Sequence, residues 1–387
     1  MISTRVNYIT ALLIILYLPV TAQNSSDGRS GSNLIITGVP FLLIAPDARS
    51  GSMGDVGVAT SPDANSIHWN PAKLAFMKSK AGVSLSYSPW LQRLVPDINL
   101  AYLSGYHRLD DRNTVGGSLR YFSLGDITLT DVGGIQTGSL NPSEFALDGT
   151  LARKFGDNFS LGTALRFIYS NLGGGQSSGT GQPISKPGTA IAADVSGYFK
   201  KETQLLGSDA RMALGFNISN IGNKISYTEG SNNKVFLPTN FKLGTATTFL
   251  NGSSEFTVAL DFNKLLAPTP PIYDENDKIV EGKDPNRSVP AAIFGSFGDA
   301  PGGFSEELRE ISYSAGLEYL YNKQIALRGG YFYENPQKGD RQYITLGAGL
   351  RYNVFTIDFA YLLASQQKSP LANTLRFSLV FNMTHAD

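Results

Sequence analysis

Beyond residue 80, apolar and polar residues alternate at a period of two in segments of about ten residues. In the segment that begins at Asn158, Phe159 and Leu161 fall on one face, whereas Ser160 and Arg166 fall on the other. Successive side chains of a β-strand point to opposite faces, so this alternation predicts strands. About fourteen strands are predicted, beginning near Ala81, Asp97, Asn113, Pro142, Asn158, Gly188, Asp209, Pro238, Ser253, Glu307, Lys323, Asp340, Val354 and Ala372.

The predicted connections alternate between short and long. Short links fall at 110–113, 156–158, 251–253, Asn322 and Asn353, with one longer exception at 201–208. Long links fall at 124–141, 172–187, 221–237 and 266–305, with shorter members of this set at 88–96, 335–339 and 365–371. Outer-membrane barrels with an even number of strands have short periplasmic turns and longer outside loops. A β-sandwich has no reason to sort its connections in this way.

The polar faces of the predicted strands carry single charges between small residues. They are Arg120, Asp148, Arg166, Asp194, Arg211, Lys242, Asp261, Glu318, Arg328, Arg351, Asp358 and Arg376. A soluble sandwich also places charges on its outer face, so this observation alone leaves that alternative open. Aromatic residues near strand ends, such as Tyr319, Tyr321 and Tyr352, favour the girdles of a membrane barrel. We therefore predict an all-β chain that forms a transmembrane antiparallel β-barrel of about fourteen strands.

The stretch 41–76 follows neither a strand period nor a helix period. It is rich in glycine and turn-forming residues, with apolar residues at irregular spacing. A barrel of about fourteen strands is too wide for its own side chains to fill. We therefore expect residues 41–80 to form an N-terminal plug inside a barrel built by residues 81–387. Asp47, Arg49 and Asp55 are candidates for pairing with charges of the lumen.

The first residues have the pattern of a secretory signal peptide. Arg5 precedes an apolar run from Ile9 to Leu18, and Val20-Thr21-Ala22 places small residues before Gln23. The run is shorter than the roughly 20 residues of a membrane-spanning helix, which argues against a membrane anchor. We expect residues 1–22 to be removed and residues 23–40 to be a periplasmic lead-in, with both termini on the periplasmic side.

Composition excludes several classes of function. The chain has no cysteine, which excludes disulfides and thiol chemistry, and 32 basic residues balance 32 acidic ones, which argues against nucleic acid. A serine-hydrolase pattern at 175–179 lies in a low-complexity loop without the strand-turn-helix that the motif requires. His68, His107 and His385 are isolated, and the acidic run 274–277 lacks the spacing of a calcium loop. We expect no enzyme activity, no metal and no cofactor.

Two predicted loops combine proline with apolar residues, which is typical of contact surfaces. The alternatives are that the 266–305 loop folds back over the barrel mouth and that Trp90 anchors in the lipid interface. The candidate partner-binding residues are Trp90, Leu91, Pro290, Ile293, Phe294 and Phe297.

The run from Val39 to Phe76 resembles the N-terminal region of the PorV family, outer-membrane barrels of the type IX secretion system. More loosely it resembles the FadL-like family, whose members have a plug inside a fourteen-stranded barrel. A run of small residues with alanine is frequent in the family where this chain has Ser50-Gly51-Ser52. The matching positions are Pro46, Asp47, Ala48, Arg49, Gly54, Asp55, Gly57, Ala59, Asn70, Pro71 and Ala72.

The resemblance implies a non-enzymatic protein of a Gram-negative outer membrane, surrounded by lipid and with its loops facing the cell surface. Such proteins receive the C-terminal signal domain of exported cargo at the translocon barrel and deliver it to a sortase-like attachment complex. The FadL-like alternative is transport of hydrophobic small molecules, with Arg120, Arg166 and Arg211 binding a fatty-acid carboxylate. Polar strand faces of glycine, alanine, serine and charge favour the carrier. A secreted β-sandwich adhesin is a third possibility, which extraction from membranes by salt would support.

Overall fold

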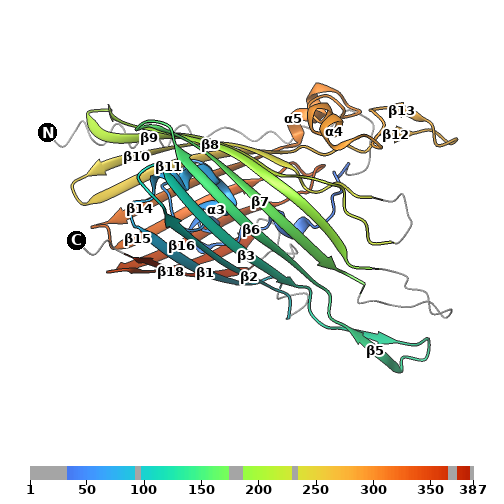
Figure 1. The fold of residues 1–387 in the computed structure, drawn as a ribbon. Coiled ribbons are helices and arrows are strands. Elements are labelled where there is room, and N and C mark those ends of the chain that lie inside the picture. The colour runs from blue at the N-terminus through green and yellow to red at the C-terminus, as the bar shows by residue number, and fades with distance from the viewer. Residues whose placement is uncertain (1–32, 92–96, 174–185, 229–233, 365–372, 384–387) are drawn as a thin grey trace. The chain divides into compact units, whose positions relative to one another are not determined.

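Fourteen antiparallel strands form a closed barrel in the computed structural model, which describes residues 33–91, 97–173, 186–228, 234–364 and 373–383 (Figure 1). The predicted signal peptide, the motif at 175–179 and His385 lie outside these ranges. The first strand, β1 (Ala81–Pro89), pairs with the last, β18 (Leu375–Met383), and this pairing closes the wall. The predicted strand number and barrel class are confirmed.

The other twelve strands of the wall follow one another in chain order. They are β2 (Asn99–Arg108), β3 (Asn113–Ser123), β6 (Ser143–Lys154), β7 (Phe159–Asn171), β8 (Gly188–Leu205), β9 (Ser208–Gly222), β10 (Asn240–Asn251), β11 (Ser254–Leu265), β14 (Ile311–Tyr321), β15 (Ile325–Tyr333), β16 (Gln342–Tyr352) and β17 (Phe355–Ala364). Every neighbouring pair is antiparallel, as short hairpin connections permit.

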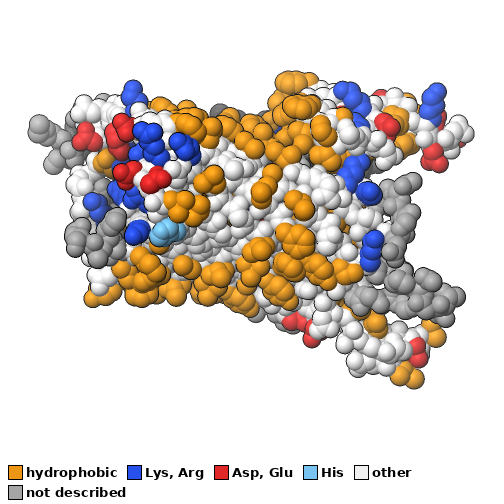
Figure 2. Space-filling view, viewed as in Figure 1, with side chains coloured by type: hydrophobic (Ala, Val, Ile, Leu, Met, Phe, Trp, Pro, Cys, Tyr) orange, Lys and Arg blue, Asp and Glu red, His pale blue; other side chains and the backbone are white. Residues whose placement is uncertain are grey.

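The wall has the polarity of a membrane barrel, with apolar side chains outside and polar ones inside. Along β17, Phe355, Ile357 and Phe359 are exposed, whereas Asp358 and Ala360 point inward and are buried. Figure 2 shows apolar side chains spread along the wall and charged ones gathered toward its two ends. Because the exposed face is apolar and the lumen is polar, lipid is the medium that fits the outer face.

Short and long connections alternate, as the sequence predicts. The short ones span 109–112, 155–158, 206–207, 252–253, 322–324 and 353–354. The expected exception at 201–208 is wrong, because β8 continues to Leu205 and turns through Leu206 and Gly207, both at positive φ. Such a two-residue turn matches the twist of the paired strands. The expected strand start at Glu307 is also wrong, since Glu307 lies in a helix and β14 begins at Ile311.

The long connections carry regular structure of their own. Between β3 and β6 a hairpin consists of β4 (Ile127–Thr130) and β5 (Gln136–Leu140). Residues 266–310, which we call the loop platform, contain the hairpin β12 (Ile272–Tyr273) and β13 (Ile279–Glu281), followed by α4 (Val289–Gly295) and α5 (Phe304–Arg309). Within the described ranges, no helix has the length and apolar character needed to cross a membrane.

The predicted plug lies inside the barrel. It consists of four short helices, η1 (Pro40–Leu43), α2 (Ala48–Gly51), α3 (Ser66–Trp69) and η2 (Pro71–Phe76), joined by turns. Asp47 and Asn70 begin α2 and η2 by accepting hydrogen bonds from backbone N–H groups of the first turn. Almost every residue from Val39 to Met77 is buried against the inner face of the wall (Figure 1).

The chain enters the lumen at the end that carries the long connections. Asn33 donates to backbone oxygens of Gln337 and Pro270, at 3.0 and 3.3 Å, and Gly38 donates to that of Phe236 at 2.8 Å. All three acceptors belong to long connections. The plug then leads to β1, which begins at the short-turn end. Residues 33–38 therefore lie at the end of the barrel that carries the long connections.

Candidate functional site

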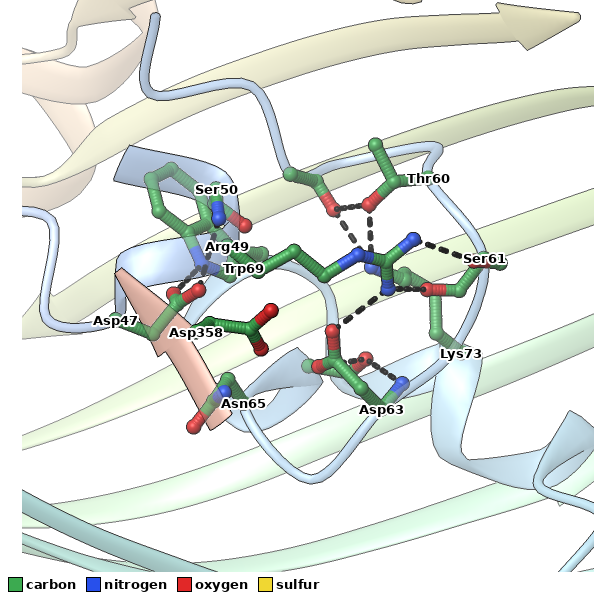
Figure 3. A network of polar contacts seen from close by, with 12 residues as sticks. Asp47, Arg49, Ser50, Thr60, Ser61, Asp63, Asn65, Trp69, Lys73 and Asp358 are labelled. Carbon is green, nitrogen blue, oxygen red and sulfur yellow. Dashed lines mark hydrogen bonds and ion pairs between the residues drawn. The ribbon is translucent and has the colours of Figure 1, made fainter. Parts of the chain in front are cut away.

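The plug is attached to the wall through an ion network around Arg49. The guanidinium of Arg49 donates to both carboxylate oxygens of Glu318 in β14, at 3.1 and 2.9 Å. It also donates to Asp63 of the plug at 2.9 Å (Figure 3). Glu318 also accepts from Arg328, which pairs with Asp358 at 2.7 Å. These side chains are almost fully buried except Asp63, so removing one member leaves a buried charge without its partner.

A second set of contacts surrounds Asp47. Its carboxylate accepts from the backbone N–H of Ser50 and, at 2.6 Å, from the indole N–H of Trp69 (Figure 3). Burial, with Asp63 nearby, raises the pKa of Asp47 to about 6. Burial and the neighbouring Arg120 lower the pKa of His68 well below its usual value. His68 is therefore neutral and accepts from Arg120 at Nδ1.

The turn from Gly54 to Val58 contacts wall strands on both sides of β14. Asp55, at a φ of 62°, accepts from Arg376 at 2.9 Å and from the hydroxyl of Tyr343 at 2.6 Å. The carboxylate of Asp261 in β11 accepts the backbone N–H groups of Gly57 and Val58. Of the three candidates for pairing with charges of the lumen, Arg49 and Asp55 form such pairs, with Glu318 and Arg376. Asp47 instead accepts hydrogen bonds from Ser50 and Trp69 of the plug itself.

The Asn70-Pro71-Ala72 step attaches the end of the plug to the wall. The Asn70 amide donates to backbone oxygens of Val58 and Gly197, at 2.9 and 3.0 Å. The N–H of Ala72 reaches the hydroxyl of Ser196, and the Ala72 carbonyl accepts from Ser160. This turn therefore hydrogen-bonds to the neighbouring strands β7 and β8. Pro46, the residue before Asp47, is buried like most of the plug.

Glycines of the wall allow the plug backbone to approach, and the sequence did not single them out individually. A Cβ at Gly215 would lie 2.6 Å from the carbonyl oxygen of Val58, and one at Gly316 would lie 2.6 Å from that of Met53. In the sequence, they could have been recognised as glycines on the polar face of a strand with alternating polarity. The glycines that face plug backbone atoms are Gly162, Gly215, Gly316 and Gly330, whereas Gly244 and Gly347 face side-chain atoms of Val58 and Ser52.

The predicted partner-binding residues fall into two separate places. Pro290, Ile293 and Phe294 lie on α4 and Phe297 follows it, and Phe294 is 81% exposed. Trp90 and Leu91 instead pack toward the lumen, against a cluster that includes Phe41 and Leu42 of the plug. Arg376 also lies over the Trp90 ring. The role of all six in partner binding stays a prediction.

The loop platform is braced by charges that the sequence did not reveal. Lys264 donates to Glu307 and Glu310 at 2.8 and 2.6 Å, and Lys338 donates to Glu306 and Glu310 at 2.6 and 3.0 Å. Lys338 and the neighbouring hydrogen bonds lower the pKa of Glu306 to about 2 against the effect of its burial. Phe304 and Leu308 of α5 are exposed and add to the apolar surface of α4. The amphipathic pattern of residues 304–309 could have predicted the α5 helix that carries Phe304 and Leu308.

The arginines proposed for a fatty-acid carboxylate already have partners. Arg120 donates to the Phe41 and Leu42 carbonyls and contacts His68. Arg166 pairs with Asp148 and Asp194, and Arg211 pairs with Glu202. The N–H groups of these arginines therefore bond to other residues of the protein and do not point to a bound carboxylate.

Among the described residues, cavities lie at both ends of the plug. One of about 590 Å³ lies at the short-turn end, where Lys78, Lys323 and Asn353 are among its lining residues. A smaller one of about 80 Å³ lies near the long connections, between Leu43, Trp69 and Lys242. In the part of the chain that the structure describes, no group of three or more His, Cys, Asp or Glu side chains forms a candidate metal site.

A closed fourteen-stranded wall, apolar outside and filled by an N-terminal plug, defines a β-barrel of the outer-membrane type. The family model described as "Type IX secretion system protein PorV" matches residues 27–272, more than half of the chain. The chain therefore belongs to the PorV family, and the predicted resemblance is confirmed.

Solved structures agree with this fold. The toluene transporter TodX of P. putida aligns with a TM-score of 0.52 at 13% identity, over 88% of this chain and 99% of the transporter. The toluene transporter TbuX of Ralstonia pickettii aligns at 0.47 and 13% identity, over 88% and 98%. A FadL homologue of Pseudomonas aeruginosa aligns at 0.44 and 11% identity, over 91% and 100%. No curated protein matches the sequence. At these identities the likeness concerns the fold alone.

Proposed function

We propose that this protein is a non-enzymatic carrier of the type IX secretion system. It binds the C-terminal signal domain of exported cargo at the translocon barrel and delivers the cargo to a sortase-like attachment complex at the cell surface. Family membership supports a place in this system. The long connections face the cell surface and the short turns face the periplasm, as is usual for outer-membrane barrels. Residues 1–22 act as the signal peptide.

The observation that carries this proposal is the exposed apolar surface of the loop platform. Phe294 and Phe304 are 81% and 77% exposed, and Phe297 and Leu308 are also exposed. The helices that carry them are braced by the ion pairs of Lys264 and Lys338. Aromatic side chains presented on a rigid support lose little conformational entropy on binding, and this favours a protein partner.

The contacts between plug and wall argue against transport of a molecule through the lumen. The plug is joined to the wall by buried ion pairs of Arg49 and Arg376 and by backbone hydrogen bonds to Asp261. A molecule that passed through would have to break several of these contacts together. The FadL-like alternative therefore gains no support from the lumen, since Arg120, Arg166 and Arg211 are engaged as well.

The test is co-purification of a signal domain with a double variant, Phe294→Ser with Phe297→Ser. Burying one phenylalanine is worth roughly 1.5–3 kcal/mol, so we expect the retained signal domain to fall by about tenfold or more. Leu206→Ser is the matched control, because Leu206 is equally exposed but lies in a short turn at the other end. Heat-modifiable migration in gels would show that both variants keep the barrel. Undiminished co-purification of the double variant would remove this surface from the binding site.

A further inference from the structure

Three lysines gather around the ring of Phe76, where the plug ends at the short-turn end of the barrel. The ammonium nitrogens of Lys200 and Lys154 lie 4.6 and 5.5 Å from the centre of that ring. Lys78, which follows the plug, is near enough to repel the charge of Lys200, as Lys154 also does. An aromatic ring attracts a cation but leaves its charge in place. We call Lys78, Lys154 and Lys200 the Phe76 lysines.

A cavity of about 590 Å³ opens beside these lysines. Phe76, Lys78 and Lys200 are among its lining residues, and Met77 adds apolar surface. Lys323 lines the same cavity from the turn between β14 and β15. Pockets that hold ligands usually measure about 300–1,000 Å³, so this one can take a segment of several residues' side chains.

The arginines of the cavity are balanced by carboxylates. Arg211 pairs with Glu202 at 2.7 Å. The other described guanidinium and carboxylate groups of this region form a set of three cations and three anions: Arg49, Arg328 and Arg351 with Asp63, Glu318 and Asp358. These residues together contribute no net charge to the cavity.

The lysines of the cavity have no such balance. Lys323 and the Phe76 lysines carry four ammonium groups, and no hydrogen bond or ion pair of their side chains is found among the described residues. Of the described carboxylates that line the cavity, only Glu255 remains to neutralise them. Asp157, in the turn before β7, is exposed and does not line it. One carboxylate for four ammonium groups leaves an excess of positive charge, which attracts an anion.

We propose that this cavity binds an acidic peptide segment of another protein, which enters from the short-turn end. Carboxylates of the segment accept hydrogen bonds from Lys200 and Lys323, while its apolar parts contact Phe76 and Met77. The ammonium groups stand on different strands and turns, and this spacing favours a chain with several carboxylates over one small anion. The site lies at the opposite end from the loop platform and does not depend on the proposed carrier function.

The test is calorimetric titration of the detergent-purified, full-length protein with a blocked hexapeptide of alternating glutamate and glycine. The same peptide with glutamine in place of glutamate, and citrate as a small anion, are the control probes. We expect saturable binding of the acidic peptide, at least tenfold tighter than either control and weaker as salt screens the charges. No binding of the acidic peptide, or equally tight binding of a control probe, would overturn the proposal. Binding that appears only after residues 384–387 are removed would show that the chain's own carboxyl end fills the cavity, which would overturn it as well.

Charge-removing variants locate the site. Lys78→Gln with Lys200→Gln should lower the affinity for the acidic peptide at least tenfold, and Lys323→Gln alone should also lower it. The matched control is Lys278→Gln with Lys283→Gln, which removes two exposed charges from the loop platform at the other end and should bind as the wild type does. Heat-modifiable migration would show that the variants keep the barrel. Wild-type affinity in the first double variant, or an equal loss in the control, would contradict the assignment.

Discussion

At Asp47, burial and hydrogen bonding act in opposite directions on the charge of the carboxylate. Its carboxylate is fully buried and accepts hydrogen bonds from Ser50 and Trp69, which favour the charged form. Loss of hydration and the nearby Asp63 outweigh these contacts and raise its pKa to about 6. The pKa of Asp47 in the folded protein is above its unfolded value of 3.8, so the folded state favours the protonated carboxyl group. The contribution of Asp47 to the free energy of unfolding is therefore complete below pH 3.8 and is lost as the pH rises through 6.

The Asp47→Asn variant tests this sign. It keeps an acceptor for the Trp69 indole but cannot ionise. From below pH 4 to above pH 6, we expect the free energy of unfolding of the wild type to fall by about 3 kcal/mol relative to the variant. Urea unfolding in detergent at several pH values measures the difference. A difference that stays constant with pH would refute the assigned pKa shift.

At the scale of elements, the plug and the wall fit because both have small residues where they meet. Met53 and Gly54 of the plug lie against the backbone of β15 at Gly330. A Cβ at Gly330 would collide with the backbone atoms of Met53 and Gly54. Backbone atoms cannot move aside as a flexible side chain can. The adjacent Gly329 has nothing nearer than 3.8 Å and lies on the other face of the strand. The two neighbours therefore form a matched pair.

Gly330→Val should displace the plug without removing the barrel. Overpacking a tight contact typically costs 1–3 kcal/mol, and the plug, which has no strand pairing with the wall, is the part that can move. We expect a clear increase of conductance in planar bilayers with heat-modifiable migration retained. Gly329→Val should stay closed like the wild type. If Gly330→Val also stayed closed, plug and wall would not be packed as described.

At the scale of the whole molecule, the plug crosses the lumen in one direction. Asn33 and Gly38 are bonded to long connections, whereas β1 starts at the short-turn end. Leu34 and Ile36 are exposed beside the long connections. In the proposed orientation, with the long connections at the cell surface, the segment before the plug would be accessible from outside the cell.

Single-cysteine labelling tests this orientation, since the natural chain has no cysteine. We expect Ile36→Cys to react with a membrane-impermeant maleimide on intact cells. Lys323→Cys, in a short turn, should react only after the outer membrane is permeabilised. The reverse pattern would show that the long connections face the periplasm and would contradict the proposed carrier orientation.

Local pattern determined much of this architecture. Each strand has its own alternation and each turn its own residues, so strand number and alternating connections could be predicted from Ala81 onward. The α4 helix had signals that were missed: Ser288 stands at its N-cap and proline follows in the first turn. The apolar run there was interpreted only as a loop surface.

The sequence by itself determined the barrel, its membrane polarity and the presence of a plug, because each depends on residues close together in the chain. Only the tertiary structure decided which charges pair, since Arg49 and Glu318 are 269 residues apart and meet only when the barrel closes. The same closure places Asn33 among the long connections. Closure brings together side chains whose distance along the chain carries no local signal.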